Sequence, residues 1–221
     1  MRHLVTLSDV SAPEIRRIFS IAEDLKAKFM QGLREPLLPG RVLALLFEKQ
    51  SLRTRVSFES GMVHLGGSSI MLGEDVGFGK RESVADFDRE HSEMVDVVVN
   101  RSRKHSTVEE FAEHSACSVI NGLTDLAHPC QALADIFTLQ EQFGELAGLR
   151  LAWVGDGNNV ARSLVRACGH LGVELAVCTP KGYELDTDFV KQARKEFPNL
   201  ALDTTNDPIE GVRACMGQEA E

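Results

Sequence analysis

Two hydroxyls and two guanidinium groups fall within five residues, at Ser51-Leu52-Arg53-Thr54-Arg55. The apolar run before them, residues 42–47, is typical of a buried strand, and Ser51 is a favourable N-cap for a helix that follows. The first backbone N–H groups of a helix lack intrahelical acceptors, and arginines add charge-assisted bonds, so the segment predicts a phosphate site. A capped helix with solvated arginines is the alternative.

A second cluster, His128-Pro129-Cys130-Gln131, begins a predicted helix at residues 129–143, with Pro129 suited to its first turn. A histidine at a helix start can donate a hydrogen bond to a carbonyl oxygen and stabilise negative charge on it. A glutamine nearby can accept from an amide N–H. The pair would form a catalytic device if a substrate carbonyl reached it. The alternative is a capping histidine beside a solvent-facing glutamine.

Strand and helix patterns alternate along the chain, which predicts an α/β fold of two doubly wound parallel-sheet domains. Such folds bind ligands at the carboxyl ends of strands. A boundary near residues 144–148 divides the chain into a domain at 1–145 and a second, incomplete domain at 146–221. Strands are expected at 42–47, 68–72, 95–99, 118–121, 150–154, 173–178 and 200–203, and helices at 11–25, 51–62, 108–114, 129–143, 160–171 and 188–197.

The composition is that of an acidic globular protein of 221 residues, with a net charge of -9 and a sequence pI near 5.3. This balance argues against nucleic acid as a partner, and the basic cluster at Arg53 and Arg55 therefore indicates a small anionic ligand. Five cysteines without C-x-x-C spacing fit reduced thiols and no zinc site. No apolar stretch is long enough for a signal sequence or a membrane span, which predicts a cytoplasmic protein without membrane contact.

The segment Gly155-Asp156-Gly157-Asn158-Asn159-Val160 follows a predicted strand and resembles a dinucleotide-binding fingerprint. The pattern G-x-G-x-x-G fails at Val160. The next strand ends in Cys178-Thr179-Pro180, without the acidic residue that would bind a ribose. NAD binding is therefore disfavoured.

Taken together, the two clusters and Arg101 resemble the aspartate/ornithine transcarbamylase family, most closely its ornithine branch. Residues 51–55 are similar to the family's Ser-Thr-Arg-Thr-Arg carbamoyl phosphate motif, and residues 128–131 to its His-Pro-x-Gln motif. The resemblance implies that Arg53, Arg101 and His128 act in catalysis. It implies a substrate-binding set of Ser51, Leu52, Arg53, Thr54, Arg101, His128, Gln131, Asn159, Cys215 and Met216.

The acceptor amine is indicated by Asp-Gly-Asn-Asn at residues 156–159, which resembles the ornithine branch, and by Met216-Gly217-Gln218-Glu219, which resembles that branch's Ser-Met-Gly-Gln-Glu loop. By this likeness Asn159 holds the amino-acid end of ornithine. The implied reaction is attack of the neutral δ-amine of ornithine on carbamoyl phosphate, giving citrulline and phosphate. It requires no metal or organic cofactor, and the resemblance implies a homotrimer.

The chain also departs from the family pattern. Leu52 replaces a threonine, and Gly77 stands where a polar loop side chain is usual. A segment is expected to be missing near Arg213, and the chain stops at Glu221 before the family's His-Cys-Leu-Pro motif. Three hypotheses follow: an active ornithine carbamoyltransferase of which this chain is an incomplete part, a truncated carbamoyl phosphate-binding protein with little transferase activity, and an unrelated anion-binding or regulatory module. A transcarbamylase acting on a related amine is a further variant.

Overall fold

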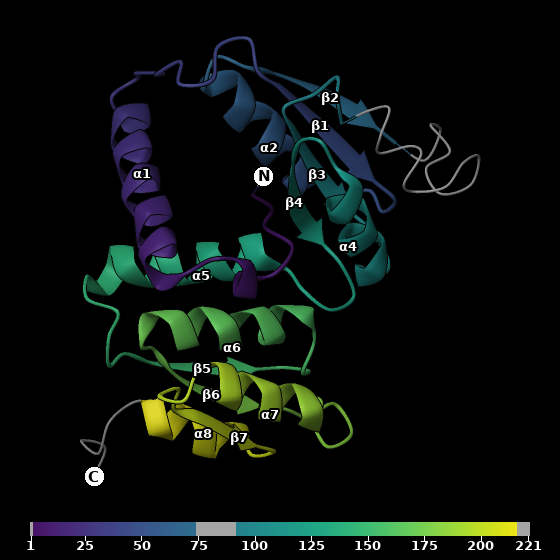
Figure 1. The fold of residues 1–221 in the computed structure, drawn as a ribbon. Helices are drawn as coiled ribbons and strands as arrows, with labels where there is room; N and C mark the ends of the chain where they lie inside the picture. The colour runs from purple at the N-terminus through teal and green to yellow at the C-terminus, as the bar shows by residue number, and fades with distance from the viewer. Residues whose placement is uncertain (1, 74–91, 216–221) are drawn as a thin grey trace. The chain divides into compact units, whose positions relative to one another are not determined.

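The computed structural model describes residues 2–73 and 92–215, which form two compact units (Figure 1). The first unit spans Met1–Ala127 and the second His128–Glu221. Each holds a parallel sheet with helices, as the α/β prediction required. The division precedes helix α5 (Pro129–Phe143) because α5 packs against α6 (Asn159–Leu171). The domain boundary expected after residue 145 stays a prediction.

The first unit contains a four-stranded parallel sheet in the order β2-β1-β3-β4. Its strand β1 is a continuous apolar run, as expected of a strand covered on both faces. The expected loop at 73–82, with Gly77, lies outside the described residues apart from Gly73. The elements are a short 3-10 helix at Leu7–Asp9, α1 (Ala12–Met30), β1 (Val42–Phe47), α2 (Leu52–His64), β2 (Ser68–Leu72), β3 (Val97–Arg101), α4 (His105–His114) and β4 (Ser118–Leu123).

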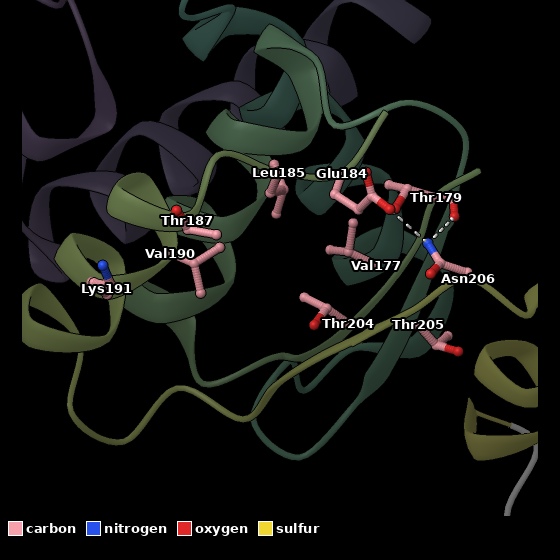
Figure 2. A pocket seen from close by; sticks show the side chains of 10 residues that line it. All are labelled: Val177, Thr179, Glu184, Leu185, Thr187, Val190, Lys191, Thr204, Thr205 and Asn206. Carbon is pink, nitrogen blue, oxygen red and sulfur yellow. Dashed lines mark hydrogen bonds between the residues drawn. The ribbon is translucent and has the colours of Figure 1, made fainter. Parts of the chain in front are cut away.

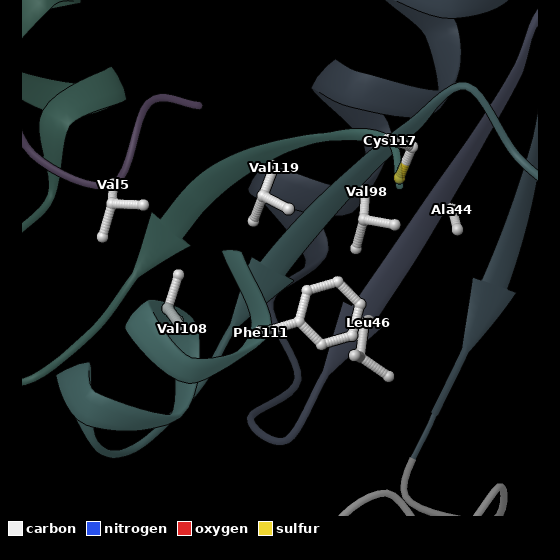
Figure 3. Close-up of a cluster of buried hydrophobic side chains, with 8 residues drawn as sticks. All are labelled: Val5, Ala44, Leu46, Val98, Val108, Phe111, Cys117 and Val119. Atoms are coloured by element: carbon white, nitrogen blue, oxygen red, sulfur yellow. The ribbon is translucent and has the colours of Figure 1, made fainter. Parts of the chain in front are cut away.

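Alternate residues of β1 carry the packing on the two faces of this sheet. On one face Leu46 belongs to a cluster with Val108 and Phe111 of α4, and Figure 3 shows the Phe111 ring beside Leu46. On the other face Leu45 packs in a cluster with Met62 of α2. The sheet is thus fixed between α2 and α4, and so is the point where α2 begins.

The second unit contains a three-stranded parallel sheet in the order β5-β6-β7. Helices α6 and α7 adjoin one another, because Arg162 of α6 stacks over the Phe189 ring of α7. Helix α8 lies against β6, where Gly211 lies so near Cys178 that an added Cβ would be 2.0 Å from its Sγ. The strands and remaining helices are β5 (Arg150–Val154), β6 (Glu174–Cys178), α7 (Thr187–Glu196), β7 (Leu202–Thr205) and α8 (Pro208–Cys215).

Strands β1, β2 and β5 and helix α5 have the expected bounds, and the other expected elements begin or end up to five residues from the expected positions. Two differences bear on the site. Strand β3 runs from Val97 to Arg101 rather than 95–99, because its pairing with β1 continues to the Phe47–Arg101 pair. Helix α8 was not expected. Asp207 caps it by accepting from the Ile209 N–H at 2.8 Å, and Pro208 is its first residue. In the described ranges, no helix is both long and apolar enough to cross a membrane.

Truncating Leu45 tests the packing that fixes α2. This side chain is fully buried. We expect Leu45→Ala to lower the free energy of unfolding by about 2–5 kcal/mol, through lost burial and the cavity left behind. The matched change Val63→Ala, on the exposed side of α2, should cost less than about 0.5 kcal/mol. Urea unfolding followed by circular dichroism measures both. Equal losses in the two variants would contradict this description of the core.

Candidate active site

The first part of the site lies at the point where the strand order of the first unit's sheet reverses. From β1 the chain proceeds to β2 on one side, and later returns to place β3 on the other side. Ligands of open α/β sheets bind outside the carboxyl ends of the strands at such a switch point. Phe47 and Arg101, the last residues of β1 and β3, are paired there, and the Glu48 N–H donates to the Arg101 carbonyl at 3.0 Å.

Helix α2 begins directly beyond this pair. Ser51 is its N-cap, and its carbonyl accepts from the Arg55 N–H at 3.0 Å. The amides of residues 52–54 therefore precede the first intrahelical bond and can donate to an anion. The Ser51 hydroxyl donates to Thr54 Oγ1 at 3.0 Å. The side chains of Leu52 and Arg53 are exposed.

The Arg101 guanidinium lies beside this helix start. Its side chain is only 8% exposed, and Nη1 donates to Thr54 Oγ1 at 3.5 Å and to the Gly122 carbonyl at 3.4 Å. Its buried Nε has no hydrogen-bond partner among the described residues, none of which offers it a carboxylate. Burial lowers the pKa of Arg101. A buried cation whose hydrogen bonds within the described ranges are two long ones to neutral oxygens would be stabilised by an anion.

A β-bulge between β3 and β4 helps to orient the Arg101 side chain. Asn100 pairs with Asn121 but Arg101 pairs with Leu123, so Gly122 is the extra residue. A Cβ on Gly122 would lie 2.9 Å from Val99 Cγ1, which explains the need for glycine. Bulges often re-aim a side chain beside an active site, and here the bulge also supplies a carbonyl oxygen to Arg101.

Buried polar groups hold the chain that follows β4. Thr124 and Ala127 exchange hydrogen bonds: the Thr124 N–H donates to the Ala127 carbonyl at 2.9 Å, and the Ala127 N–H donates to Thr124 Oγ1 at 3.2 Å. His105 Nδ1 is 2.8 Å from the same Thr124 Oγ1. The side-chain amide of Asn121 donates from Nδ2 to the Val5 carbonyl at 2.9 Å. Sequence reasoning missed this network, because it brings His105 and Val5 to residues 121–127 from distant parts of the chain.

The second motif begins α5 in the other unit. His128 is the N-cap and is half-buried, and Pro129 occupies the first helical position as predicted. Gln131 is exposed and its Nε2 donates to Asp135 Oδ1 at 2.8 Å. Burial raises the pKa of Asp135, and the bond from Gln131 partly offsets this. The Gln131 side chain is thus oriented by its own helix.

The two asparagines that begin α6 have separate roles. Asn158 caps the helix, because its Oδ1 accepts from the amides of Val160 and Ala161 at 2.9 and 3.2 Å. Asn159, the first helical residue, is joined to His128 through Ser163, whose hydroxyl contacts both backbones. The structure therefore brings two of the predicted site residues together at the starts of α5 and α6. Ser163 itself was not singled out from the sequence.

Cys215 is not brought to these residues. It lies at the end of α8 in a small crevice with Arg150, Glu174 and Asp203, near the beginnings of β5, β6 and β7. Asn159, by contrast, follows the end of β5. The reason is that α8 runs back along the sheet after β7. Its last residue therefore reaches the end of the sheet where the strands begin. Met216 lies outside the described residues.

The glycine-rich turn after β5 serves chain packing. A Cβ on Gly157 would lie 2.5 Å from the Leu185 backbone nitrogen, and the Gly157 N–H donates to the Tyr183 carbonyl at 2.7 Å. This glycine thus permits the close approach of the loop at 183–185, a structural reason for glycine that needs no dinucleotide.

A separate pocket of about 380 Å³ lies between α7 and the ends of β6 and β7. Figure 2 shows Asn206 at one side of it, donating to the Thr179 carbonyl at 2.9 Å and to Glu184 at 3.2 Å. None of the predicted site residues is among those that line it. The lining residues are Val177, Thr179, Glu184, Leu185, Thr187, Val190, Lys191, Thr204, Thr205 and Asn206.

Two sequence profiles of one protein family match this chain. The profile described as "Aspartate/ornithine carbamoyltransferase, carbamoyl-P binding domain" matches residues 2–141. The profile described as "Aspartate/ornithine carbamoyltransferase, Asp/Orn binding domain" matches residues 147–216. Together these two ranges contain every residue that the sequence assigned to the site.

Relatives named ornithine carbamoyltransferase are similar along the whole chain. The protein of Carboxydothermus hydrogenoformans is 43% identical over 233 positions, covering 100% of this chain and 75% of the relative. That of Bacillus subtilis is 42% identical over 234 positions, covering 100% and 72%. Both alignments are longer than the 221 residues of this chain, so each contains positions that it lacks. The missing segment expected near Arg213 stays a prediction.

Solved structures agree in fold as well as sequence. Ornithine carbamoyltransferase from Pyrococcus furiosus has a TM-score of 0.92 at 40% identity, covering 99% of this chain and 74% of that chain. The enzyme from Thermus thermophilus has a TM-score of 0.85 at 43% identity, covering 96% and 70%. The chain belongs to the aspartate/ornithine carbamoyltransferase family.

Proposed function

We propose that this protein transfers the carbamoyl group of carbamoyl phosphate to the δ-amine of ornithine, giving citrulline and phosphate. One observation carries the proposal. Arg101 is a buried guanidinium, without a carboxylate among the described residues, beside two hydroxyls at a helix N-terminus. A phosphate dianion supplies the charge and the acceptor oxygens that this arrangement calls for.

In this proposal the phosphoryl group is bound by the start of α2, through the Ser51 and Thr54 hydroxyls, the amide of Leu52 and the side chain of Arg53. Arg101 bridges the phosphate and the carbonyl oxygen. The replacement of threonine by leucine at position 52 removes a hydroxyl but keeps the backbone N–H. Multiple charge-assisted donors are needed, because an exposed helix terminus alone contributes only about 0.3–1 kcal/mol.

The carbamoyl carbon is attacked by the neutral amine, and the electron pair of the carbonyl moves onto its oxygen. The tetrahedral oxyanion then re-forms the carbonyl as its bond to the phosphate oxygen breaks, and the departing phosphate takes the proton that the attacking nitrogen loses. His128 and Arg101 donate to the developing oxyanion, and Gln131 orients the carbamoyl amide. Removing one such donor typically costs about 2.7–4 kcal/mol of transition-state stabilisation. Orientation of the two reactants supplies the rest without a covalent enzyme intermediate.

Asn159 holds the amino-acid end of ornithine in this scheme, and Asn158 is left to cap α6. The names of the relatives support ornithine rather than aspartate as the acceptor. A cytoplasmic location, a homotrimeric assembly and a part in arginine biosynthesis are further elements of the proposal. They rest on the family resemblance.

A second candidate function is carbamoyl phosphate binding with little or no transfer. The position of Cys215 favours it, because this residue lies near the beginnings of the β5–β7 strands, away from Asn159. The predicted contribution of Cys215 and Met216 to the ornithine site would then be lost. The loss of Cys215 and Met216 from the ornithine site would leave the proposed phosphate-binding groups of the first unit unaffected.

Citrulline formation tests the two functions against each other. With carbamoyl phosphate and ornithine, we expect the purified chain to form citrulline, and His128→Ala to lower kcat about 100-fold or more through the lost oxyanion donor. A colorimetric citrulline assay measures this. Phosphate binding without citrulline formation would support the second candidate. Absence of both would refute the two together.

Phosphate affinity tests the role assigned to Arg101. We expect Arg101→Gln to weaken binding of inorganic phosphate about 10- to 150-fold, since a hydrogen bond to a charged group contributes about 1.5–3 kcal/mol. Arg55→Gln is the matched control, because it removes the same charge from an arginine that is exposed and paired with Glu59 at 3.1 Å. Isothermal titration calorimetry measures both. A similar loss in the two variants would show that the effect is one of net charge alone.

A further inference from the structure

One buried hydroxyl connects the starts of α5 and α6. The His128 N–H donates to Ser163 Oγ at 2.9 Å, and this hydroxyl in turn donates to the Asn159 carbonyl at 2.9 Å. Ser163 is 2% exposed. Water therefore has little access to replace either bond.

The direction of both bonds is fixed by chemistry. An amide N–H can only donate and a carbonyl can only accept, whereas a hydroxyl does both at once. His128 is the N-cap of α5, so its N–H has no acceptor within that helix. Ser163 supplies the acceptor, and its own proton must then point to Asn159. The hydroxyl thus sets the distance between two backbones that belong to different helices.

The three residues do not share one sequence motif. His128 lies in the range of the carbamoyl phosphate-binding profile, and Asn159 and Ser163 lie in the range of the aspartate/ornithine-binding profile. Ser163 therefore joins the residue expected to contact the carbamoyl group to the residue expected to contact the acceptor.

From this geometry we propose that Ser163 is a positioning residue, which holds His128 and Asn159 at the spacing required for the amine to reach the carbamoyl carbon. This inference rests on the proposed transferase function. The Ser163 hydroxyl is assigned no contact with either substrate in this scheme, because it is bonded to the His128 and Asn159 backbones. Its hydroxyl acts through the backbones at the starts of α5 and α6, and an error of about 1 Å in such positioning can cost about 100-fold in rate.

A serine within a helix commonly donates to the carbonyl four residues earlier, and that bond alone has only local consequences. The chain offers a matched control for it. Thr138 of α5 makes the same type of bond, to the Ala134 carbonyl at 2.8 Å, but it is exposed and joins no second helix in the part of the chain that the structure describes. Thr138→Ala therefore removes a back-bonded hydroxyl without removing the link between helices.

The test compares Ser163→Ala, Ser163→Cys and Thr138→Ala with the unchanged chain in the citrulline assay, well below their melting temperatures. We expect Ser163→Ala to lower kcat tenfold or more and Thr138→Ala to stay within twofold. Ser163→Cys keeps the side chain's shape but offers a weak donor, so it should also fall at least threefold even if the alanine variant does not fold. Turnover within twofold in the Ser163 variants would overturn the proposal.

Ser163→Thr is the rescue variant, because it retains the hydroxyl. Its kcat should exceed that of Ser163→Ala, even though the added methyl group must be accommodated in a buried position. Equal losses in the threonine and alanine variants would mean that packing, rather than the hydrogen-bonded link, is what Ser163 provides, and would count against the positioning role.

A readout without turnover separates this inference from the proposed function. Hydrogen exchange of the His128 amide, followed by NMR, should be at least tenfold faster in Ser163→Ala than in Thr138→Ala. If the unchanged chain forms no citrulline, the transferase proposal fails, and the exchange result still decides whether the link holds His128. Unchanged exchange in Ser163→Ala would overturn the inference whether or not the chain is active.

Discussion

The structure of the first unit depends on keeping a guanidinium buried without a carboxylate among its described neighbours. Desolvation disfavours the charged form, and the burial of Arg101 lowers its pKa accordingly. Thr54 and the Gly122 carbonyl offer only long contacts, at 3.5 and 3.4 Å. The strand pairing, the bulge at Gly122 and the start of α2 all converge on this one side chain. A bound anion would complete its coordination.

The second unit meets a different constraint, which is the satisfaction of helix termini. His128 and Asn158 are both N-caps, yet their terminal groups are satisfied differently. Asn158 uses its own side chain, whereas the His128 amide uses the hydroxyl of another helix. The bond from the His128 amide connects α5 to α6, and the His128 side chain makes no capping hydrogen bond. The two hydrogen bonds of the Ser163 hydroxyl therefore contribute both to local stability and to the proposed function.

Features encoded locally were predictable from the sequence. The apolar run of β1 gave the correct bounds of that strand, and the cap at Ser51 gave the correct start of α2, because both signals lie within a few residues. The family resemblance placed Arg101 and Thr54 in one site, but local patterns could not predict the hydrogen bond between their side chains, because it requires β3 to pair beside β1. The bulge at Gly122 likewise depends on how β3 pairs with β4, and the link through Ser163 depends on how α5 packs against α6.

Some signals were present in the sequence but were not used. Asn206-Asp207-Pro208 combines a cap with a first-turn proline, and it marks the start of α8. Recognition of that helix would have placed Cys215 near the beginnings of the strands. Ser163 stands four residues after Asn159 on the buried side of α6, where a polar residue calls for a partner. The residues that lie beside Cys215 and Ser163 could not be identified without the fold.

The central claim is that the start of α2 and Arg101 bind the phosphoryl group of carbamoyl phosphate. A crystal structure of the chain grown at saturating inorganic phosphate tests it most directly. The account predicts a phosphate whose oxygens lie about 2.7–3.2 Å from the Arg101 guanidinium and from amides in the first turn of α2. Ordered water alone at this position, with phosphate bound elsewhere, would contradict it.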